Sequence, residues 1–243
     1  MIGKREWGAV APLALVLVVM LAALACASKQ DNDKPRAAVD ESTTINRAPA
    51  TQTTARPRLL FLGTSLTAGL GLYPDSAYPA VIQRLAAKNG YAVEVINAGL
   101  SGETSAGALR RVDWLLTQPL AAVVIETGAN DGLRGLLPDS TAANITALIG
   151  KVHAVQPRAG IVLAQMEAPT NLGPDFQRRF HALYADVARK TGVRLMPFLL
   201  DGVGGHRELN QDDGIHPTAK GARMVAANVF RSLRPVLDSL AKR

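Results

Sequence analysis

The stretch Arg58-Leu-Leu-Phe-Leu-Gly-Thr-Ser65 opens the part of this 243-residue chain that carries a fold signal. Its apolar run, residues 59–62, is short and typical of a buried strand. The glycine that follows permits a tight turn, and two hydroxyl side chains come directly after it. This order is typical of a βα unit, in which polar residues gather at the carboxyl end of a parallel sheet.

Four more apolar runs follow, separated by longer segments in which apolar residues recur with helical spacing. The five strand candidates are Leu59–Leu62, Ala92–Ile96, Ala121–Glu126, Ile161–Met166 and Val193–Pro197. Alternation of this kind predicts the α/β class: a single flavodoxin-like domain with three layers, α/β/α, around a five-stranded parallel sheet. Each strand is expected to be covered by helices on both faces.

Proline and glycine mark the expected helix ends. Pro138 indicates a helix start, whereas Gly90 and Gly192 indicate helix stops. The last helix is expected to begin near Pro217. It carries an apolar stripe that predicts core packing, made of Val225, Val229, Leu233, Leu237 and Leu240.

Composition excludes several classes of protein. Hydrophobic residues make up 48% of the chain and charged residues only 19%, which excludes disorder throughout. The net charge of +7 falls to +5 within residues 58–243, where 20 basic residues stand against 15 acidic ones. No basic run interleaved with aromatic residues occurs, so the sequence predicts no nucleic-acid partner.

The first 25 residues have the layout of a secretory signal. Lys4 and Arg5 precede the uncharged stretch Ala9–Ala25, which ends in small residues. A membrane-spanning helix is the competing interpretation, but this stretch is at the short limit for a bilayer and contains Pro12. Residues 1–25 are therefore predicted to be a cleaved signal peptide and the protein to be exported.

Cys26, the single cysteine, follows the apolar run directly and excludes an internal disulfide. Its position resembles the lipobox of bacterial lipoproteins, although Ala23 stands where leucine is usual. Lipidation of Cys26 would give a membrane-anchored or periplasmic lipoprotein. An ordinary signal-peptidase site is the alternative and would give a secreted protein. Residues 26–57 contain almost no large apolar residue and are predicted to be a tether without a fold.

Polar and glycine-rich segments lie where the loops of such a sheet are expected. They are Gly63-Thr64-Ser65-Leu66, Asn97-Ala98-Gly99, Gly128-Ala129-Asn130-Asp131 and Asp212-Asp213-Gly214-Ile215-His216-Pro217. Each alone has an ordinary explanation as a cap or a turn. Four such loops at one end of one sheet instead predict a functional site.

The residue types in these loops suit nucleophilic catalysis. Ser65 needs a general base to remove its proton, and His216 can act as that base. Asp213, three residues before His216, can hold the imidazole, while Asp212 is a weaker candidate for the same role.

Attack of a serine on a carbonyl carbon also needs donors for the developing oxyanion. The backbone N–H groups of Ser65 and Gly99 and the side-chain amide of Asn130 are the candidate oxyanion hole. No histidine has a second ligand at metal spacing, so we expect no metal site and no cofactor.

These four segments resemble those of the SGNH, or GDSL-type, hydrolases, whose letters correspond here to Ser65, Gly99, Asn130 and His216. The resemblance covers residues 58–243 and is strongest to the bacterial arylesterase, thioesterase I and lysophospholipase subgroup. It implies a Ser-His-Asp acyl-enzyme mechanism on aryl, short-to-medium acyl or thio esters, or on lysophospholipids. The family usually has aspartate before the nucleophile, whereas this chain has Thr64, from which we expect a modest change in geometry and pH profile.

Alternative functions remain open at this point. A carbohydrate-ester deacetylase would use the same machinery, and a catalytically silent binding lipoprotein would keep the fold alone. A phosphate loop at residues 63–69 lacks the Gly-Lys-Ser/Thr ending. The Gly-x-Ser-x-Gly elbow of the α/β-hydrolases is also absent, and Ser101 is expected to be structural. The expected partners are a small-molecule or lipid ester and, through Cys26, a membrane, with the protein itself a monomer.

Overall fold

The computed structural model describes residues 55–242. The predicted signal peptide, residues 1–25, the lipidation site Cys26 and the tether up to residue 54 lie outside this part of the chain. Residues 55–57, the end of the predicted tether, have no regular secondary structure. The first strand begins at Arg58, where the sequence places the start of the domain.

A five-stranded parallel sheet forms the centre of the domain, in the strand order β2-β1-β3-β4-β5. The strands are β1 Arg58–Gly63, β2 Glu94–Gly99, β3 Ala122–Ile125, β4 Gly160–Gln165 and β5 Arg194–Phe198. The predicted fold class and strand number are confirmed.

The helices alternate with the strands. They are α1 Ser65–Ala68, α2 Tyr78–Lys88, α3 Ser105–Leu115, α4 Ala129–Leu133, α5 Pro138–Val155, α6 Pro174–Thr191 and α7 Ala219–Ala241. Short 3-10 helices span Pro74–Ser76, Thr170–Leu172 and Arg207–Leu209. Pro138 opens α5 and Gly192 follows α6 in a left-handed conformation, as the sequence predicts.

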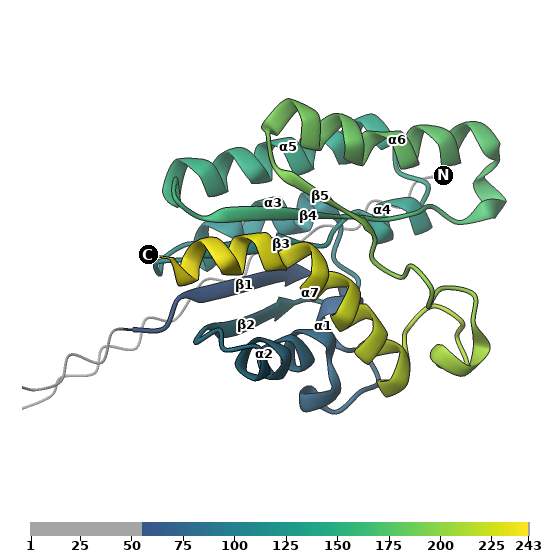
Figure 1. Ribbon diagram of the computed structural model, residues 1–243. Helices are drawn as coiled ribbons and strands as arrows, with labels where there is room; N and C mark the ends of the chain where they lie inside the picture. Colours follow the sequence, from purple (N-terminus) through teal and green to yellow (C-terminus); the bar gives the residue numbers. More distant parts are fainter. Residues whose placement is uncertain (1–54, 243) are drawn as a thin grey trace, which may run out of the picture. The chain divides into compact units, whose positions relative to one another are not determined.

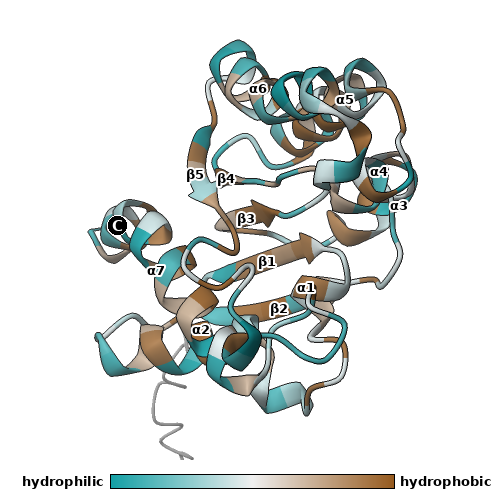
Figure 2. Cartoon of the chain, turned by 90° about the vertical axis from the view of Figure 1, so that its right-hand side faces the viewer, coloured by the Kyte–Doolittle hydropathy of each residue, from teal (hydrophilic) through white to brown (hydrophobic). Residues whose placement is uncertain are grey.

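Helices cover the sheet on both faces (Figure 1). Helices α2 and α7 contact each other on one face, while α5 lies between α3 and α6 on the other. Strands β1 and β3 are hydrophobic along most of their length, whereas the helices alternate between hydrophobic and hydrophilic residues (Figure 2). The stripe on α7 packs into the core at four of its five positions, and Leu240 is partly buried.

Strand β2 departs from the prediction in two ways. It begins at Glu94 and runs on to Gly99, because Asn97, Ala98 and Gly99 pair in register with β1. It also lies at the sheet edge, and its residues are exposed or half-buried rather than covered on both faces. An edge strand needs only one paired neighbour, so its apolar pattern is weak and its end is hard to locate from sequence.

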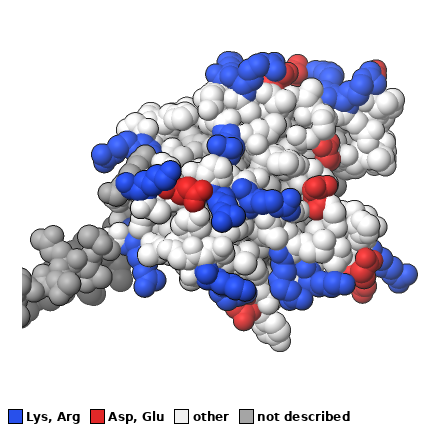
Figure 3. All heavy atoms as spheres, viewed as in Figure 1, with Lys and Arg blue, Asp and Glu red and all other residues white. Residues whose placement is uncertain are grey.

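Charged side chains are dispersed over the surface. Figure 3 shows lysine and arginine in several separate groups on one face, with acidic side chains beside some of them. Within residues 55–242, no helix combines the length and hydrophobicity that crossing a bilayer requires. In the same part of the chain, no group of three or more acidic, histidine or cysteine side chains is placed to hold a metal ion.

Candidate active site

The topology brings the polar segments together at the carboxyl ends of β1, β2 and β3. Strand β1 pairs with β2 on one side and β3 on the other, so the chain direction across the sheet reverses here. Such a point is where ligands bind in open α/β sheets. Ser65 is the first residue of α1, directly after β1, and Thr64 occupies the N-cap position.

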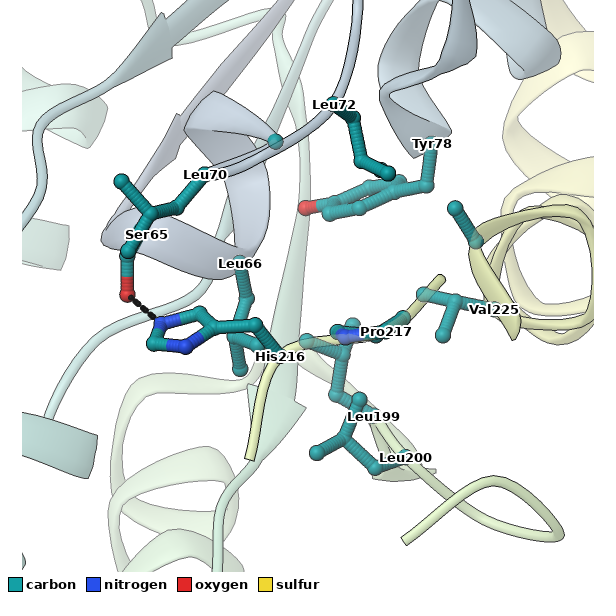
Figure 4. Close-up of a pocket in the computed structure, with 12 residues that line it drawn as sticks. Ser65, Leu66, Leu70, Leu72, Tyr78, Leu199, Leu200, His216, Pro217 and Val225 are labelled. Atoms are coloured by element: carbon teal, nitrogen blue, oxygen red, sulfur yellow. Dashed lines mark hydrogen bonds between the residues drawn. The ribbon is translucent and has the colours of Figure 1, made fainter. Parts of the chain in front are cut away.

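Ser65, His216 and Asp213 form one hydrogen-bonded row. His216 Nε2 lies 2.8 Å from Ser65 Oγ (Figure 4), and His216 Nδ1 lies 2.6 Å from Asp213 Oδ2. An ionised carboxylate only accepts hydrogen bonds, so Nδ1 carries the proton and Nε2 is free to accept from the Ser65 hydroxyl. The imidazole is largely buried, with 15% of its side chain exposed.

Asp213 is held in its ionised form. Its Oδ1 accepts the backbone N–H groups of His216 and Ile215, both at 2.9 Å. These bonds, first that of the His216 N–H, together with the contact to the His216 ring, lower the pKa of Asp213 from 3.8 to about 2. Among the described residues, Asp212 makes no hydrogen bond to the imidazole, so Asp213 is the partner that the geometry favours.

Gln211 anchors the loop that carries His216. Its side-chain Nε2 donates to the carbonyl oxygens of Leu70, at 2.7 Å, and Pro217, at 3.0 Å. Its backbone N–H donates to the carbonyl of His216. The loop before α7 is thereby tied to the loop after α1, which keeps the histidine close to the serine.

The candidate oxyanion donors face the same end of the sheet, but two of them already have partners. The Gly99 N–H donates to Asn97 Oδ1 at 2.9 Å, and Asn130 Nδ2 donates to the Glu103 carbonyl at 3.0 Å. The Asn130 amide keeps a second N–H, and the Ser65 N–H has no acceptor among the described residues. Of the three donors, Gly99 would have to exchange its present acceptor.

Arg111 links the segments on which Gly99 and Asn130 depend. Its guanidinium donates to both carboxylate oxygens of Glu103, at 2.6 and 2.7 Å, and to the carbonyl of Ala98 at 2.7 Å. The Glu103 side chain is only 4% exposed. A bidentate pair of this kind fixes geometry as well as charge.

Glu126 lies beneath the turn that carries Ser65. This residue directly follows β3 and is completely buried. Its carboxylate accepts the N–H of Thr64 at 2.8 Å, the Thr64 hydroxyl at 2.9 Å and the Thr67 hydroxyl at 2.8 Å. The Thr67 hydroxyl in turn lies 2.8 Å from the hydroxyl of Tyr78.

A small apolar pocket, with a cavity volume of about 10 Å³, adjoins the serine and the histidine. Tyr78 and Leu72 lie on one side of it, and Pro217, Val225 and Leu199 lie on the other (Figure 4). Helices α1, α2 and α7 and the loop after β5 therefore all contribute to its wall.

Three supporting residues escaped the sequence analysis. Glu126 was the last residue of a strand candidate, and Glu103 and Arg111 were not singled out. A charged residue at the end of an apolar run is the one signal that could have drawn attention to Glu126, but it does not predict burial, because glutamate is seldom fully buried. Glu103 and Arg111 give no comparable signal, since spacing by eight residues is not a helical pairing distance.

The chain is similar to known proteins over the region that contains these segments. The GDSL-like lipase/acylhydrolase family matches residues 61–224. Esterase TesA of Pseudomonas aeruginosa is 39% identical over 188 residues, which is 77% of this chain and 92% of that protein. Thioesterase 1/protease 1/lysophospholipase L1 of Escherichia coli is 34% identical over 185 residues, covering 76% of this chain and 86% of that protein.

Solved structures agree with these sequence matches. The crystal structure of TesA superimposes with a TM-score of 0.70 and covers 74% of this chain and 99% of that one. The psychrotrophic esterase EstA from Pseudoalteromonas sp., inhibited by monoethylphosphonate, gives a TM-score of 0.71 at 34% identity, covering 74% of this chain and 98% of that one.

Proposed function

The chain belongs to the GDSL-like lipase/acylhydrolase family, and from this premise we propose that it is an exported serine esterase acting through Ser65, His216 and Asp213. The observation that carries this proposal is the row of hydrogen bonds from Ser65 Oγ through the imidazole to Asp213. A poor nucleophile, a base and an orienting carboxylate are what acyl transfer to a serine requires.

In the first half of the reaction, Ser65 Oγ attacks the carbonyl carbon of the ester. His216 Nε2 takes the hydroxyl proton as the new C–O bond forms, and Asp213 stabilises the resulting imidazolium. The tetrahedral intermediate then expels the alcohol or thiol, which receives this proton from His216. An acyl group remains on Ser65.

In the second half, a water molecule attacks the acyl-enzyme. His216 removes one proton from this water and returns it to Ser65 Oγ when the acid leaves, so the enzyme regains its starting state. The Ser65 N–H and the free N–H of the Asn130 amide are available to the oxyanion in both halves. The Gly99 N–H joins them if it exchanges its bond to Asn97. Losing one such donor costs about 3 kcal/mol of transition-state stabilisation.

The proposed substrates are aryl and short-to-medium acyl esters, thioesters or lysophospholipids. Relatives are named esterase, arylesterase and thioesterase/lysophospholipase, and the pocket beside Ser65 is lined mainly by apolar side chains. An apolar wall binds an acyl chain and gives no hydrogen bonds to a sugar, which argues for acyl esters over acetylated carbohydrate.

Replacement of Ser65 tests the proposal directly. Ser65→Ala should abolish turnover of p-nitrophenyl acyl esters, and the rates of the unmodified protein across chain lengths should show the acyl preference. An organophosphonate should add to Ser65 in the unmodified protein, as detected by mass spectrometry. Unchanged turnover in Ser65→Ala, or no phosphonate on Ser65, would contradict the mechanism and favour a silent binding protein.

Export and membrane attachment form the second part of the proposal. The signal layout of residues 1–25 and the position of Cys26 support them. Lipidation of Cys26 would hold the hydrolase at a membrane surface, and residues 26–57 would then separate the lipid from the domain. Mass spectrometry of the mature N-terminus decides between the two forms, because a lipidated chain begins at a modified Cys26. An unmodified N-terminus would leave a secreted enzyme.

A further inference from the structure

A buried carboxylate lies under the nucleophile turn, and the mechanism above gives it no role. Glu126 is completely buried at the end of β3, where no part of a substrate reaches it. Its bonding partners are Thr64, the residue before Ser65, and Thr67, two residues after it. The carboxylate therefore contacts the chain on both sides of the nucleophile.

The bonds fix backbone as well as side chains. Glu126 Oε2 accepts the Thr64 N–H at 2.8 Å, so the peptide group that enters α1 cannot rotate without losing this bond. The hydroxyls of Thr64 and Thr67 bind the two carboxylate oxygens at 2.9 and 2.8 Å. Rotation of the turn would move Ser65 Oγ away from His216, which now lies 2.8 Å from it.

The backbone of β1 is shaped for this contact. A Cβ atom on Gly63 would lie 2.0 Å from Thr67 Oγ1 and 2.7 Å from Glu126 Oε2. Any side chain at Gly63 would thus push Thr67 and the carboxylate away from the turn. Glycine is needed at position 63 because the carboxylate approaches the backbone so closely. It is not needed for the backbone conformation, since the φ of Gly63 is not in the left-handed region.

We propose that Glu126 is a positioning residue for Ser65: by holding the N–H and hydroxyl of Thr64 and the hydroxyl of Thr67, it sets the place of Oγ relative to His216. This inference rests on the nucleophilic role proposed for Ser65. It also gives Thr64 a function, since its hydroxyl donates to a carboxylate that another strand supplies.

Among residues 55–242, the groups that bind the Glu126 carboxylate are the uncharged N–H and hydroxyl of Thr64 and the hydroxyl of Thr67. Burial raises the pKa of Glu126 from 4.5 to about 7, although the bonds from Thr64 and Thr67 act in the opposite direction. The titratable groups that face it are Tyr78 from α2 and Tyr184 from α6, and both have raised pKa values because they are buried. A protonated Glu126 offers fewer acceptor sites, so the turn is held less firmly below neutral pH.

The test compares kcat and KM for a short p-nitrophenyl ester from pH 5 to pH 9. A single group that must lose its proton before the reaction gives log kcat/KM a slope of one on the acid side. If Glu126 must also be ionised, two protons must be lost, so log kcat/KM of the unmodified protein should approach a slope of two. Glu126→Gln should lower kcat by about 10- to 100-fold, leave KM within about two-fold and return the slope to one.

Two further variants separate positioning from general instability. Ile149→Val trims a fully buried core residue on α5 and should leave the pH profile unchanged. Thr64→Val removes the hydroxyl and should lower kcat, whereas Thr64→Ser should restore most of the rate.

The outcomes distinguish the two proposals. If Ser65→Ala keeps its turnover, the proposed function fails. If Ser65→Ala is inactive but Glu126→Gln keeps the rate and the slope of the unmodified protein, only the role of Glu126 fails. Should Glu126→Gln not fold, the Thr64 variants decide: a Thr64→Val protein with the kcat of the unmodified protein overturns the inference.

Discussion

Two glutamates support the active site from within the protein, and they do so in different ways. Glu103 binds Arg111 with both carboxylate oxygens and offers its own carbonyl to Asn130. Glu126 binds hydroxyl and N–H groups at the turn of Ser65, and its pKa is raised to about 7 by burial. The two buried glutamates thus differ in their partners: Glu103 is paired with an arginine, whereas Glu126 is bound only by uncharged donors and has a raised pKa.

The difference indicates a division of roles. On the side of the candidate oxyanion donors, Glu103 is held by an ion pair with Arg111. The nucleophile side is held by a group whose proton can be added or removed near neutral pH. Replacing Arg111 and replacing Glu126 should therefore change the free energy of unfolding by different amounts and with a different dependence on pH.

The largest loss of stability is expected from Arg111→Met. This change leaves Glu103 buried without its cation, and breaking such a pair lowers the free energy of unfolding by about 4 kcal/mol. Urea denaturation measures the loss. Arg179→Met, which removes an exposed pair with Asp139, is the control and should change stability little. Equal effects of the two changes would show that Glu103 does not need its partner.

A somewhat smaller change in the free energy of unfolding is expected when the pH is raised. Between pH 4.5 and pH 7 the folded protein holds the Glu126 proton more tightly than the unfolded chain does, so its free energy of unfolding falls as pH rises through this window. The fall attributable to Glu126 is about 3 kcal/mol. The pKa of Asp213 is lowered to about 2, so this group titrates below the window.

Glu126→Gln isolates this contribution. The variant lacks the titrating group, so its unfolding free energy should lose less between pH 5 and pH 8 than that of the unmodified protein. Urea denaturation at both values checks it. Parallel curves for the two proteins would mean that Glu126 titrates with an ordinary pKa.

The smallest of the three effects is expected from Gly63→Ala. The added methyl group meets Thr67 and Glu126, and overpacking of this kind costs about 2 kcal/mol. Gly150→Ala is a matched control, because a Cβ there meets nothing within 4 Å and α5 gains helix propensity. The melting temperature should therefore fall in Gly63→Ala and rise in Gly150→Ala. Esterase activity should be lost only in Gly63→Ala.

Sequence reasoning located the groups whose chemistry is visible in a residue type. The strand runs, the helix ends at Pro138 and Gly192, and the loops with Ser65 and His216 were all predictable, because each depends on neighbours along the chain. Family resemblance added the pairing of loops that are far apart. The end of β2 was misplaced, since its last three residues pair with β1 although their own sequence favours a loop.

The role of Glu126 was not predictable from the sequence, and the reason is physical. Glu126 is bound by residues 59 and 62 positions away, and that contact exists only once β1 and β3 lie side by side. A glutamate at a strand end is more often solvated than buried. Its surroundings, rather than its identity, decide between the two.

The distance between Ser65 and His216 along the chain also affects how activity arises during synthesis. The serine follows the first strand and the histidine precedes the last helix, 151 residues later. A nascent chain that has emerged through β5 already contains every strand of the sheet and the nucleophile, but it has no base. The hydrogen-bonded row of Ser65, His216 and Asp213 can therefore form only after the segment before α7 has been made. A chain still being translated therefore lacks the group that we propose as the base.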